Sequence, residues 1–308
     1  MRINYRFFKN LPELRKIGFD IPKDDIAFVI YEDDEKFEKV KEILGENWLD
    51  SVIITDTDFT EKEITSSLYL SVFANKMLGY PQPESWYDES EDEEIPEVYP
   101  YESCRYLHNV FEITPSETYG YIRGKQIGYL SIQGEPKWGK SSIGGLFWLE
   151  DILFTTPEVY KTVFEPLGIE CKTVLGYGNQ KPLTTVVQLV PQGVSNSKLL
   201  LKDEDIEEKV YISEWHLERY CLNGKGFYPS FESNPGSLDF FVSRELFGAG
   251  GANFRENFIS QRLYRLLKQN NVKGLGYSPQ ESASPEEMKK YWSDIESLGS
   301  ARGRWILD

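Results

Sequence analysis

Histidine and cysteine, the residues that most often carry catalysis or bind metals, are scarce in this chain. Its 308 residues include two histidines and three cysteines, the latter being Cys104, Cys171 and Cys221. An odd number of widely spaced cysteines argues against a disulfide framework and fits a reducing compartment. None of them stands in a C-x-x-C pair, the spacing that a four-thiolate zinc site needs. The sequence therefore predicts no metal and no cofactor.

Long apolar runs are missing as well. No stretch of about 18 apolar residues exists, so no transmembrane helix is expected. The amino-terminal segment MRINYRFFKNLPELRK lacks the apolar stretch of a signal peptide, which predicts a cytoplasmic protein. Hydrophobic residues nonetheless make up 40% of the chain and aromatic residues 14%, which is enough apolar mass to fold a large core.

Basic residues are outnumbered, at 34 Lys and Arg against 50 Asp and Glu, for a net charge of −16. Such a field repels phosphate backbones and anionic lipids. The charge therefore predicts that neither nucleic acid nor a membrane is a partner, and it favours a basic protein. The alternative interpretation is that the acidity only keeps the protein soluble.

Composition divides the chain into two expected lobes, a small α/β lobe over residues 1–85 and a larger lobe over residues 99–308. An acidic, proline-containing linker or loop over residues 86–98 joins them. In the small lobe, strand patterns over 26–31 and 52–55 flank a helical pattern over 37–44 that ends at a glycine. A capping box of Thr60 and Glu63 then predicts a helix that continues to Gly79.

Strand patterns dominate the larger lobe. TYGYI and KQIGYLSI flank Arg123-Gly124 as the strands of a hairpin would, and LTTVVQLV, KVYIS and LDFFV predict further strands. Helices are expected to begin at Thr156-Pro157, to span residues 258–269, and to begin again at Ser284, where Met288, Tyr291, Trp292 and Ile295 would be buried. The predicted fold class is α+β, with mixed, largely antiparallel sheets and flanking helices in two lobes.

One string matches a phosphate-binding pattern. GEPKWGKS, with Gly134, Gly139, Lys140 and Ser141 at its defining positions, fits G-x-x-x-x-G-K-[ST]. In such a loop, backbone N–H groups and the lysine neutralise phosphate while the hydroxyl holds magnesium. The pattern requires a helix directly after it, yet SIGGLFW places two glycines in what would be the first turn. A nucleotide-binding enzyme is therefore a minor alternative.

Other catalytic groups cannot be singled out. Cys221 stands five residues after His216, which suggests a thiol nucleophile with its base, but spacing in sequence does not establish proximity in the fold, and no residue that could orient the histidine is identifiable. A structural role is favoured for both. The 50 acidic residues supply carboxylate pairs throughout the chain, so none is diagnostic of acid–base chemistry. The sequence predicts that the protein is not an enzyme.

Four strings in the last 140 or so residues carry a family resemblance: LGIECKTVLGYG, ERYCLNGKGFYP, SLDFFVSRELFG and NFISQRLYRLLKQNNVKGLGYSPQ. They resemble the carboxy-terminal half of the double-CxxCG-motif proteins, which are bacterial immunity proteins. FTEKEITSSLYL followed by GYPQPE is similar to the amino-terminal part of that family. The strings cover about half the chain. Each zinc knuckle lacks its second cysteine here, which suggests a branch in which packing replaces zinc.

The resemblance implies an immunity protein of the bacterial cytoplasm, which neutralises a cognate toxin by stoichiometric binding. Many such toxins are basic nucleases, so an acidic surface would steer the toxin into the complex. The alternative is a structural or adaptor protein whose acidity is incidental. The candidate partner-binding residues form two acidic runs: Asp88, Glu89, Glu91, Asp92, Glu93 and Glu94 in the linker, and Asp203, Glu204, Asp205, Glu207 and Glu208 in the larger lobe.

Overall fold

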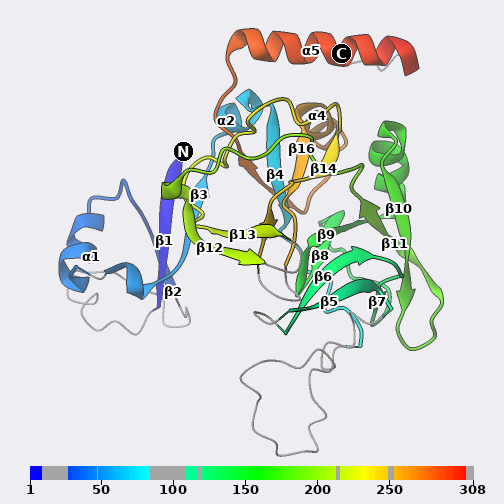
Figure 1. Cartoon of the computed structure of the whole chain (residues 1–308), viewed down its shortest axis with the longest axis horizontal. Helices are drawn as coiled ribbons and strands as arrows, with labels where there is room; N and C mark the ends of the chain where they lie inside the picture. The colour runs from blue at the N-terminus through cyan, green and yellow to red at the C-terminus, as the bar shows by residue number, and fades with distance from the viewer. Residues whose placement is uncertain are drawn as a thin grey trace, which may run out of the picture.

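The computed structural model describes residues 1–8, 27–46, 48–83, 109–116, 120–212, 216–248 and 253–302. These residues form the predicted α+β fold, with sheets that are mostly antiparallel and helices that flank them. In Figure 1 the first three strands and α1 stand to one side of a larger body that contains the other sheets. The fold class is thereby confirmed.

The small unit is an antiparallel sheet covered by one helix. Strand β1 (Arg2–Phe8) lies between β2 (Ala27–Tyr31) and β3 (Val52–Asp58). Helix α1 (Phe37–Leu44) ends as predicted at Gly45, whose φ of 79° suits glycine. Alternate residues of a strand point to the same face, and the covered face contributes to a core of six buried residues: Tyr5, Phe7, Phe28, Ile30, Phe37 and Val40.

The segment after Thr60 differs from its prediction. The capping box is present and opens α2 (Glu61–Ser66), but the helix stops there and Tyr69–Ala74 form strand β4. The helical spacing of Leu68 and Val72 is outweighed because β4 hydrogen-bonds to a neighbouring strand on each side and is almost entirely buried. Since β4 belongs to the larger body, the small unit does not extend to residue 85.

A four-stranded sheet lies at the centre of the larger body, in the order β14-β16-β4-β17. Its other strands are β14 (Phe240–Val242), β16 (Asn257–Ser260) and β17 (Leu275–Pro279). Helix α4 (Gln261–Gln269) follows β16 directly, and the hydroxyl of Ser260 accepts a hydrogen bond from the backbone N–H of Leu263 at 3.1 Å. The helix predicted from residue 258 thus begins later, because β16 pairs with β4 and β14.

A five-stranded sheet packs against β4. Its strands, in spatial order, are β7 (Ser131–Ile132), β10 (Glu170–Gly176), β11 (Pro182–Val190), β9 (Leu149–Thr155) and β8 (Ile143–Leu146). Only β7 and β10 pair in parallel among them. Between β9 and β10 the chain turns through α3 (Pro157–Val159), where Thr156 caps the helix as predicted.

A hairpin forms in this region, but contrary to the prediction Arg123-Gly124 is not its turn and lies within one of its strands. Strand β5 (Phe111–Ser116) pairs with β6 (Gly120–Gln126), and Arg123 lies inside β6, opposite Ile113. Only 5% of Arg123 is exposed. An Arg-Gly pair is typical of an exposed turn, and the sequence gives no sign of the distant residues, Asp151 and Asn253, that accept hydrogen bonds from this arginine inside the protein.

The remaining sheet and the last helix lie at the margins of the body. Strands β12 (Ile206–Ile212), β13 (Leu217–Leu222) and β15 (Leu246–Phe247) form a sheet in that order. Helix α5 (Pro285–Arg302) crosses the top of Figure 1 and begins with a capping box of Ser284 and Glu287. The described side chains predicted to be buried in it, those of Met288, Tyr291 and Trp292, are half-buried. None of the described helices combines the length and the apolar character needed to cross a membrane.

Candidate functional site

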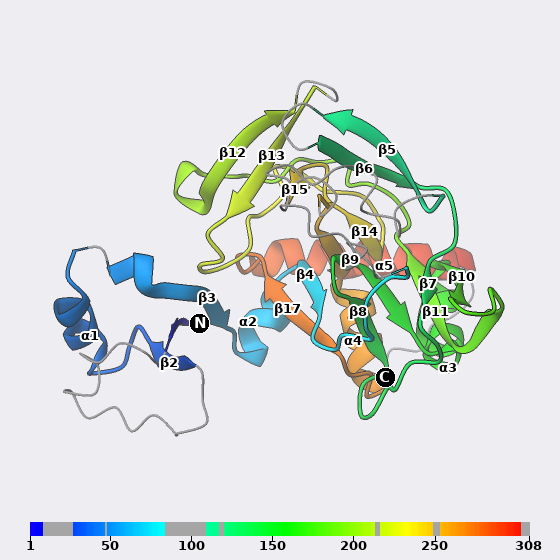
Figure 2. The same ribbon diagram turned by 90° about the horizontal axis from the view of Figure 1, so that it is seen from below.

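The acidic run over residues 203–208 lies at the start of an edge hairpin. Asp203–Asp205 form one turn of 3-10 helix that leads into β12, and β12 pairs within the described chain only with β13. Figure 2 shows the two strands at the rim of the body. We call residues 203–212 and 216–222 the acidic hairpin. An edge strand offers unpaired backbone N–H and C=O groups to another chain.

The five predicted residues of this run are not equally available. Asp203, Glu204, Glu207 and Glu208 are exposed, whereas Asp205 is half-buried. The carboxylate of Asp205 accepts a hydrogen bond from the backbone N–H of Lys202 at 3.1 Å, so it holds the 3-10 turn in place. Asp205 therefore has a structural task, and the exposed carboxylates are the ones that a partner can reach.

A β-bulge orients two of the carboxylates. Ile206 pairs with Leu222 and Glu208 with Cys221, so Glu207 is an extra residue in β12. Glu208 Oε2 lies 2.7 Å from a guanidinium nitrogen of Arg219, whose side chain is 6% exposed. Glu208 thus neutralises a buried cation.

Glu207 is left at the surface beside a cysteine. Its Oε2 lies 3.9 Å from Cys221 Sγ. Burial and the neighbouring Glu207 charge raise the pKa of the Cys221 thiol. A raised pKa keeps the sulfur protonated at neutral pH, which makes it a poor nucleophile.

The other face of the hairpin carries residues that sequence reasoning missed. Glu218 lies opposite Tyr211, and Tyr220 opposite Lys209. Lys209 Nζ lies 2.7 Å from Glu218 Oε1, and the hydroxyl of Tyr220 donates a hydrogen bond to Glu218 Oε2. These two contacts lower the pKa of Glu218. Tyr211 is 58% exposed. The period of two along β12 and β13 could have revealed this face, because it sets Lys209 and Tyr211 on one side of the strand.

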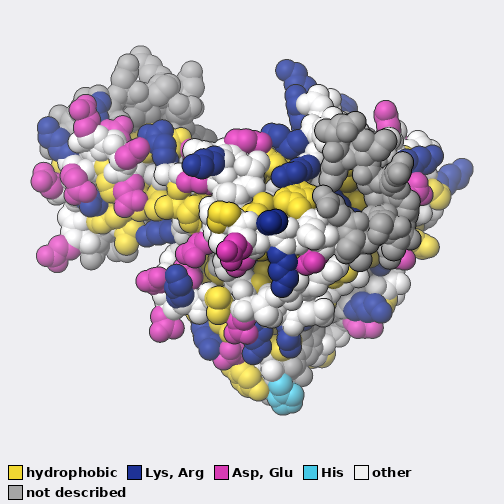
Figure 3. All heavy atoms as spheres, turned by 90° about the horizontal axis from the view of Figure 1, so that it is seen from above, with side chains coloured by type: hydrophobic (Ala, Val, Ile, Leu, Met, Phe, Trp, Pro, Cys, Tyr) yellow, Lys and Arg dark blue, Asp and Glu magenta, His cyan; other side chains and the backbone are white. Residues whose placement is uncertain are grey.

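Negative charge is concentrated locally and does not cover the whole surface. Figure 3 shows Asp and Glu (magenta) interspersed with Lys and Arg (dark blue) over the face that carries α5. Residues 203–212 and 216–222 contain six Asp and Glu against two Lys and Arg, a net charge of 2 − 6 = −4. The acidic hairpin is therefore a negative patch within a mixed surface.

The other predicted acidic run lies outside the part of the chain that the structure describes. Asp88, Glu89, Glu91, Asp92, Glu93 and Glu94 lie outside the described residues, as do Cys104 and His108. Their role in partner binding stays a prediction.

The phosphate-loop string folds as an exposed loop clamped to β11. The carboxylate of Glu135 accepts hydrogen bonds from the backbone N–H and hydroxyl groups of both Thr184 and Thr185. Trp138 Nε1 also donates to the carbonyl oxygen of Thr185 at 2.9 Å. Strand β8 follows the loop, so no helix N-terminus is aimed at a phosphate site. The geometry gives no support to nucleotide binding by Gly134, Gly139, Lys140 and Ser141.

The thiol and imidazole of the acidic hairpin are not brought together. His216 Nδ1 lies 3.2 Å from the hydroxyl of Tyr211, whereas Cys221 contacts Glu207. Five residues along a strand span roughly 16 Å. The two groups therefore do not form a nucleophile and its base.

Comparisons with protein-family models, curated proteins and solved structures found no match for this chain. Among the described residues, no three His, Cys, Asp or Glu side chains lie close enough together to hold a metal ion. The acidic hairpin is thus the described part of the chain in which predicted functional residues gather at an accessible edge.

Proposed function

We propose that this protein binds a basic protein partner through the acidic hairpin, and that it neutralises this partner as a bacterial immunity protein neutralises its toxin in the cytoplasm. One observation carries the proposal: exposed carboxylates stand on β12 (Glu207) and in the turn just before it (Asp203 and Glu204), and among the described strands β12 pairs only with β13. Such an edge can bind a partner by backbone pairing while its side chains select a cationic surface.

The carboxylates and the aromatic residue contribute differently to binding. An exposed ion pair is worth only about 0–1 kcal/mol, so the three carboxylates mainly increase the rate of association and exclude acidic proteins. Affinity at interfaces rests on aromatic and arginine side chains that lose their water on binding. Tyr211, with 58% of its surface exposed between Lys209 and Glu218, is the aromatic residue in place to act in this way.

The buried arginine explains why the hairpin is held ready for binding. Arg219 donates from Nη1 to the carbonyl oxygen of Gly248 at 2.7 Å and from Nη2 to Glu208. These bonds tie β12 and β13 to the chain that follows β15. A site that is already ordered loses less conformational entropy when a partner binds.

The first test asks whether the chain neutralises a toxin. The protein encoded directly upstream is expressed in a bacterial host with and without this chain, and growth is followed. Growth arrest that this chain relieves is the expected result. The immunity role is contradicted if the upstream protein does not arrest growth. It is also contradicted if growth arrest persists in the presence of this chain and the two proteins form no complex.

The second test asks whether the acidic hairpin is the binding surface. Glu204→Lys with Glu207→Lys is expected to slow association with the toxin about tenfold or more at low salt, and Tyr211→Ala to weaken affinity about tenfold. The matched control is Glu150→Lys with Glu170→Lys, which makes the same charge change at exposed positions of β9 and β10. Equal effects of the two double variants would remove the acidic hairpin from the proposal.

A further inference from the structure

A pocket of about 550 Å³ opens between the β5–β6 hairpin, strands β9 and β11, and residues 242–246 and 253–255. Its walls are largely aliphatic and aromatic, contributed by Phe111, Ile152, Val194, Val242, Leu246 and Phe254. Arg123, Asp151 and Asn253 also line it. An apolar cleft with a few convergent polar groups is the usual form of a small-molecule site.

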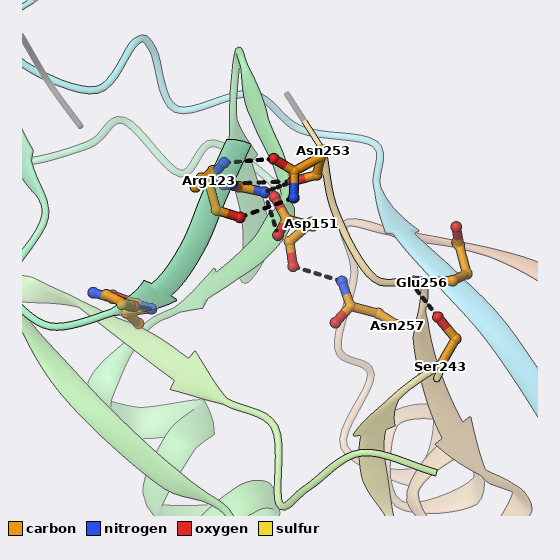
Figure 4. A network of polar contacts seen from close by, with 8 residues as sticks. Arg123, Asp151, Ser243, Asn253, Glu256 and Asn257 are labelled. Atoms are coloured by element: carbon orange, nitrogen blue, oxygen red, sulfur yellow. Dashed lines mark hydrogen bonds and ion pairs between the residues drawn. The ribbon is translucent and has the colours of Figure 1, made fainter. Parts of the chain in front are cut away.

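Arg123 is held firmly along one edge of its guanidinium group (Figure 4). Its Nη2 donates to Asp151 Oδ2 at 2.8 Å and to the carbonyl oxygen of Asn253 at 2.6 Å, and Nε donates to the same carbonyl. The side chain of Asn253 in turn bonds to the backbone N–H and carbonyl groups of Arg123. This reciprocal arrangement fixes the position of the guanidinium without using its Nη1 group.

The Nη1 group is the unexplained part of this network. It is buried and has no hydrogen-bond partner among the described residues, and Arg123 as a whole is 5% exposed. A buried donor without an acceptor is costly, more so on a charged group. An acceptor supplied by a ligand in the pocket would remove that cost.

The pocket is cationic in a strongly acidic chain. The charged residues that line it are Arg123, Lys125 and Arg255 against Glu112 and Asp151, which leaves a net charge of 3 − 2 = +1. Burial lowers the pKa of Arg255, although the charge of the neighbouring Glu245 acts in the opposite direction. One unmatched positive charge suits a ligand with a single negative charge.

We propose that this pocket binds a small amphiphilic monocarboxylate, whose anionic head accepts a hydrogen bond from Nη1 of Arg123 and whose hydrocarbon body lies against the apolar walls. One free Nη1 group, with its two N–H donors, and one unmatched charge fit a carboxylate better than a phosphate dianion, which needs more donors. The apolar walls fit a hydrocarbon chain. This site stands whether or not the acidic hairpin binds a toxin.

Octanoate is the probe for this site, because it combines one carboxylate with a short alkyl chain. Calorimetry and thermal denaturation of the full chain are expected to show octanoate binding that stabilises the protein. Octanol lacks the charge, and octyltrimethylammonium reverses it, so both are expected to bind at least about tenfold more weakly. Equal binding of these three ligands would show that the carboxylate is not recognised and would overturn the proposal.

Variants at the rim locate the site without removing Arg123, which also positions Asn253. Val194 lines the pocket and is 48% exposed, so Val194→Asp adds a repelling charge with little risk to folding. Arg255→Gln removes the second guanidinium. Each is expected to weaken octanoate binding about tenfold.

Val29→Asp is the matched control, because Val29 is a similarly exposed valine of the small unit, 43% exposed. It is expected to leave octanoate binding unchanged. An equal loss in both aspartate variants, or no loss in either pocket variant, contradicts this location. Inorganic phosphate that binds in place of octanoate would identify a simple anion site and would equally overturn the proposal.

Discussion

Replacing Glu256 with glutamine is expected to change how the stability of this protein depends on pH. Glu256 lies just before β16, and its Oε1 accepts a hydrogen bond from the hydroxyl of Ser71 at 2.8 Å. Burial raises its pKa to about 7 from the ordinary 4.5, although the hydrogen bond from Ser71 acts in the opposite direction. The folded protein therefore holds a proton on this carboxyl group in a pH range where the unfolded chain has lost it.

The sign of the effect follows from this difference in proton binding. Below pH 4.5 the carboxyl group is protonated in both states, and its contribution to stability is fully present. Between pH 4.5 and about 7 only the folded state keeps the proton, so the contribution falls as pH rises. At about 1.4 kcal/mol per pH unit, this loss amounts to at most about 3.5 kcal/mol.

Urea denaturation of the wild type and of Glu256→Gln between pH 4 and pH 8 measures this loss. Glutamine cannot ionise but keeps an oxygen for Ser71, so the variant is expected to gain stability relative to the wild type as pH rises to 7, and no more beyond it. The exposed Glu150→Gln is the control, and its difference from the wild type should not vary with pH in this way. A Glu256→Gln difference that stays constant from pH 4 to pH 8 would refute the reasoning.

Three further predictions concern single contacts. Asp239→Asn is expected to lower the free energy of unfolding by about 3–5 kcal/mol, because Asp239 is 3% exposed and neutralises the largely buried Arg262; an unchanged urea midpoint would contradict this. Cys221 should react slowly with iodoacetamide, as followed by peptide mass spectrometry, and Glu207→Gln should speed the reaction because Glu207 raises the pKa of the thiol. Glu135→Ala is expected to destabilise the protein by about 1–2 kcal/mol through the lost bonds to Thr184 and Thr185, whereas Lys140→Ala should change stability by less than about 0.5 kcal/mol and leave the calorimetric response to ATP and magnesium unaltered.

The candidate site was only partly predictable from the sequence. The run of carboxylates over residues 203–208 is visible in the sequence, and its exposure follows from its charge. The bulge at Glu207 is not, because it depends on how β12 pairs with β13. That pairing assigns Glu208 to Arg219 and leaves Glu207 at the surface, so it decides which carboxylates are available to a partner.

The Arg123 pocket was even less predictable from the sequence. Arg123 and Asn253 are 130 residues apart in sequence and are joined by reciprocal hydrogen bonds. No local pattern marks either residue, and Arg123-Gly124 instead suggested an exposed turn. A buried polar network of this kind is visible only when the strands that carry it are placed.

Local signals alone determined several elements of the fold. The capping box at Thr60, the helix start at Ser284, the cap at Thr156 and the stop at Gly45 all lie where predicted, because a cap is made by a few neighbouring residues. The chemistry of these groups is complete within one turn of chain, so no distant contact is needed to select it.

Only the tertiary structure determined the secondary structure of residues 67–79. Their apolar spacing fits a helix after α2, yet residues 69–74 form β4, because the residues of β16 and β17, some 185 to 210 positions later, hydrogen-bond to both of its edges. A segment whose apolar spacing fits both a helix and a strand adopts the one that buries its side chains and also pairs its backbone N–H and C=O groups. The sequence determined where elements begin, and long-range pairing determined what this segment became.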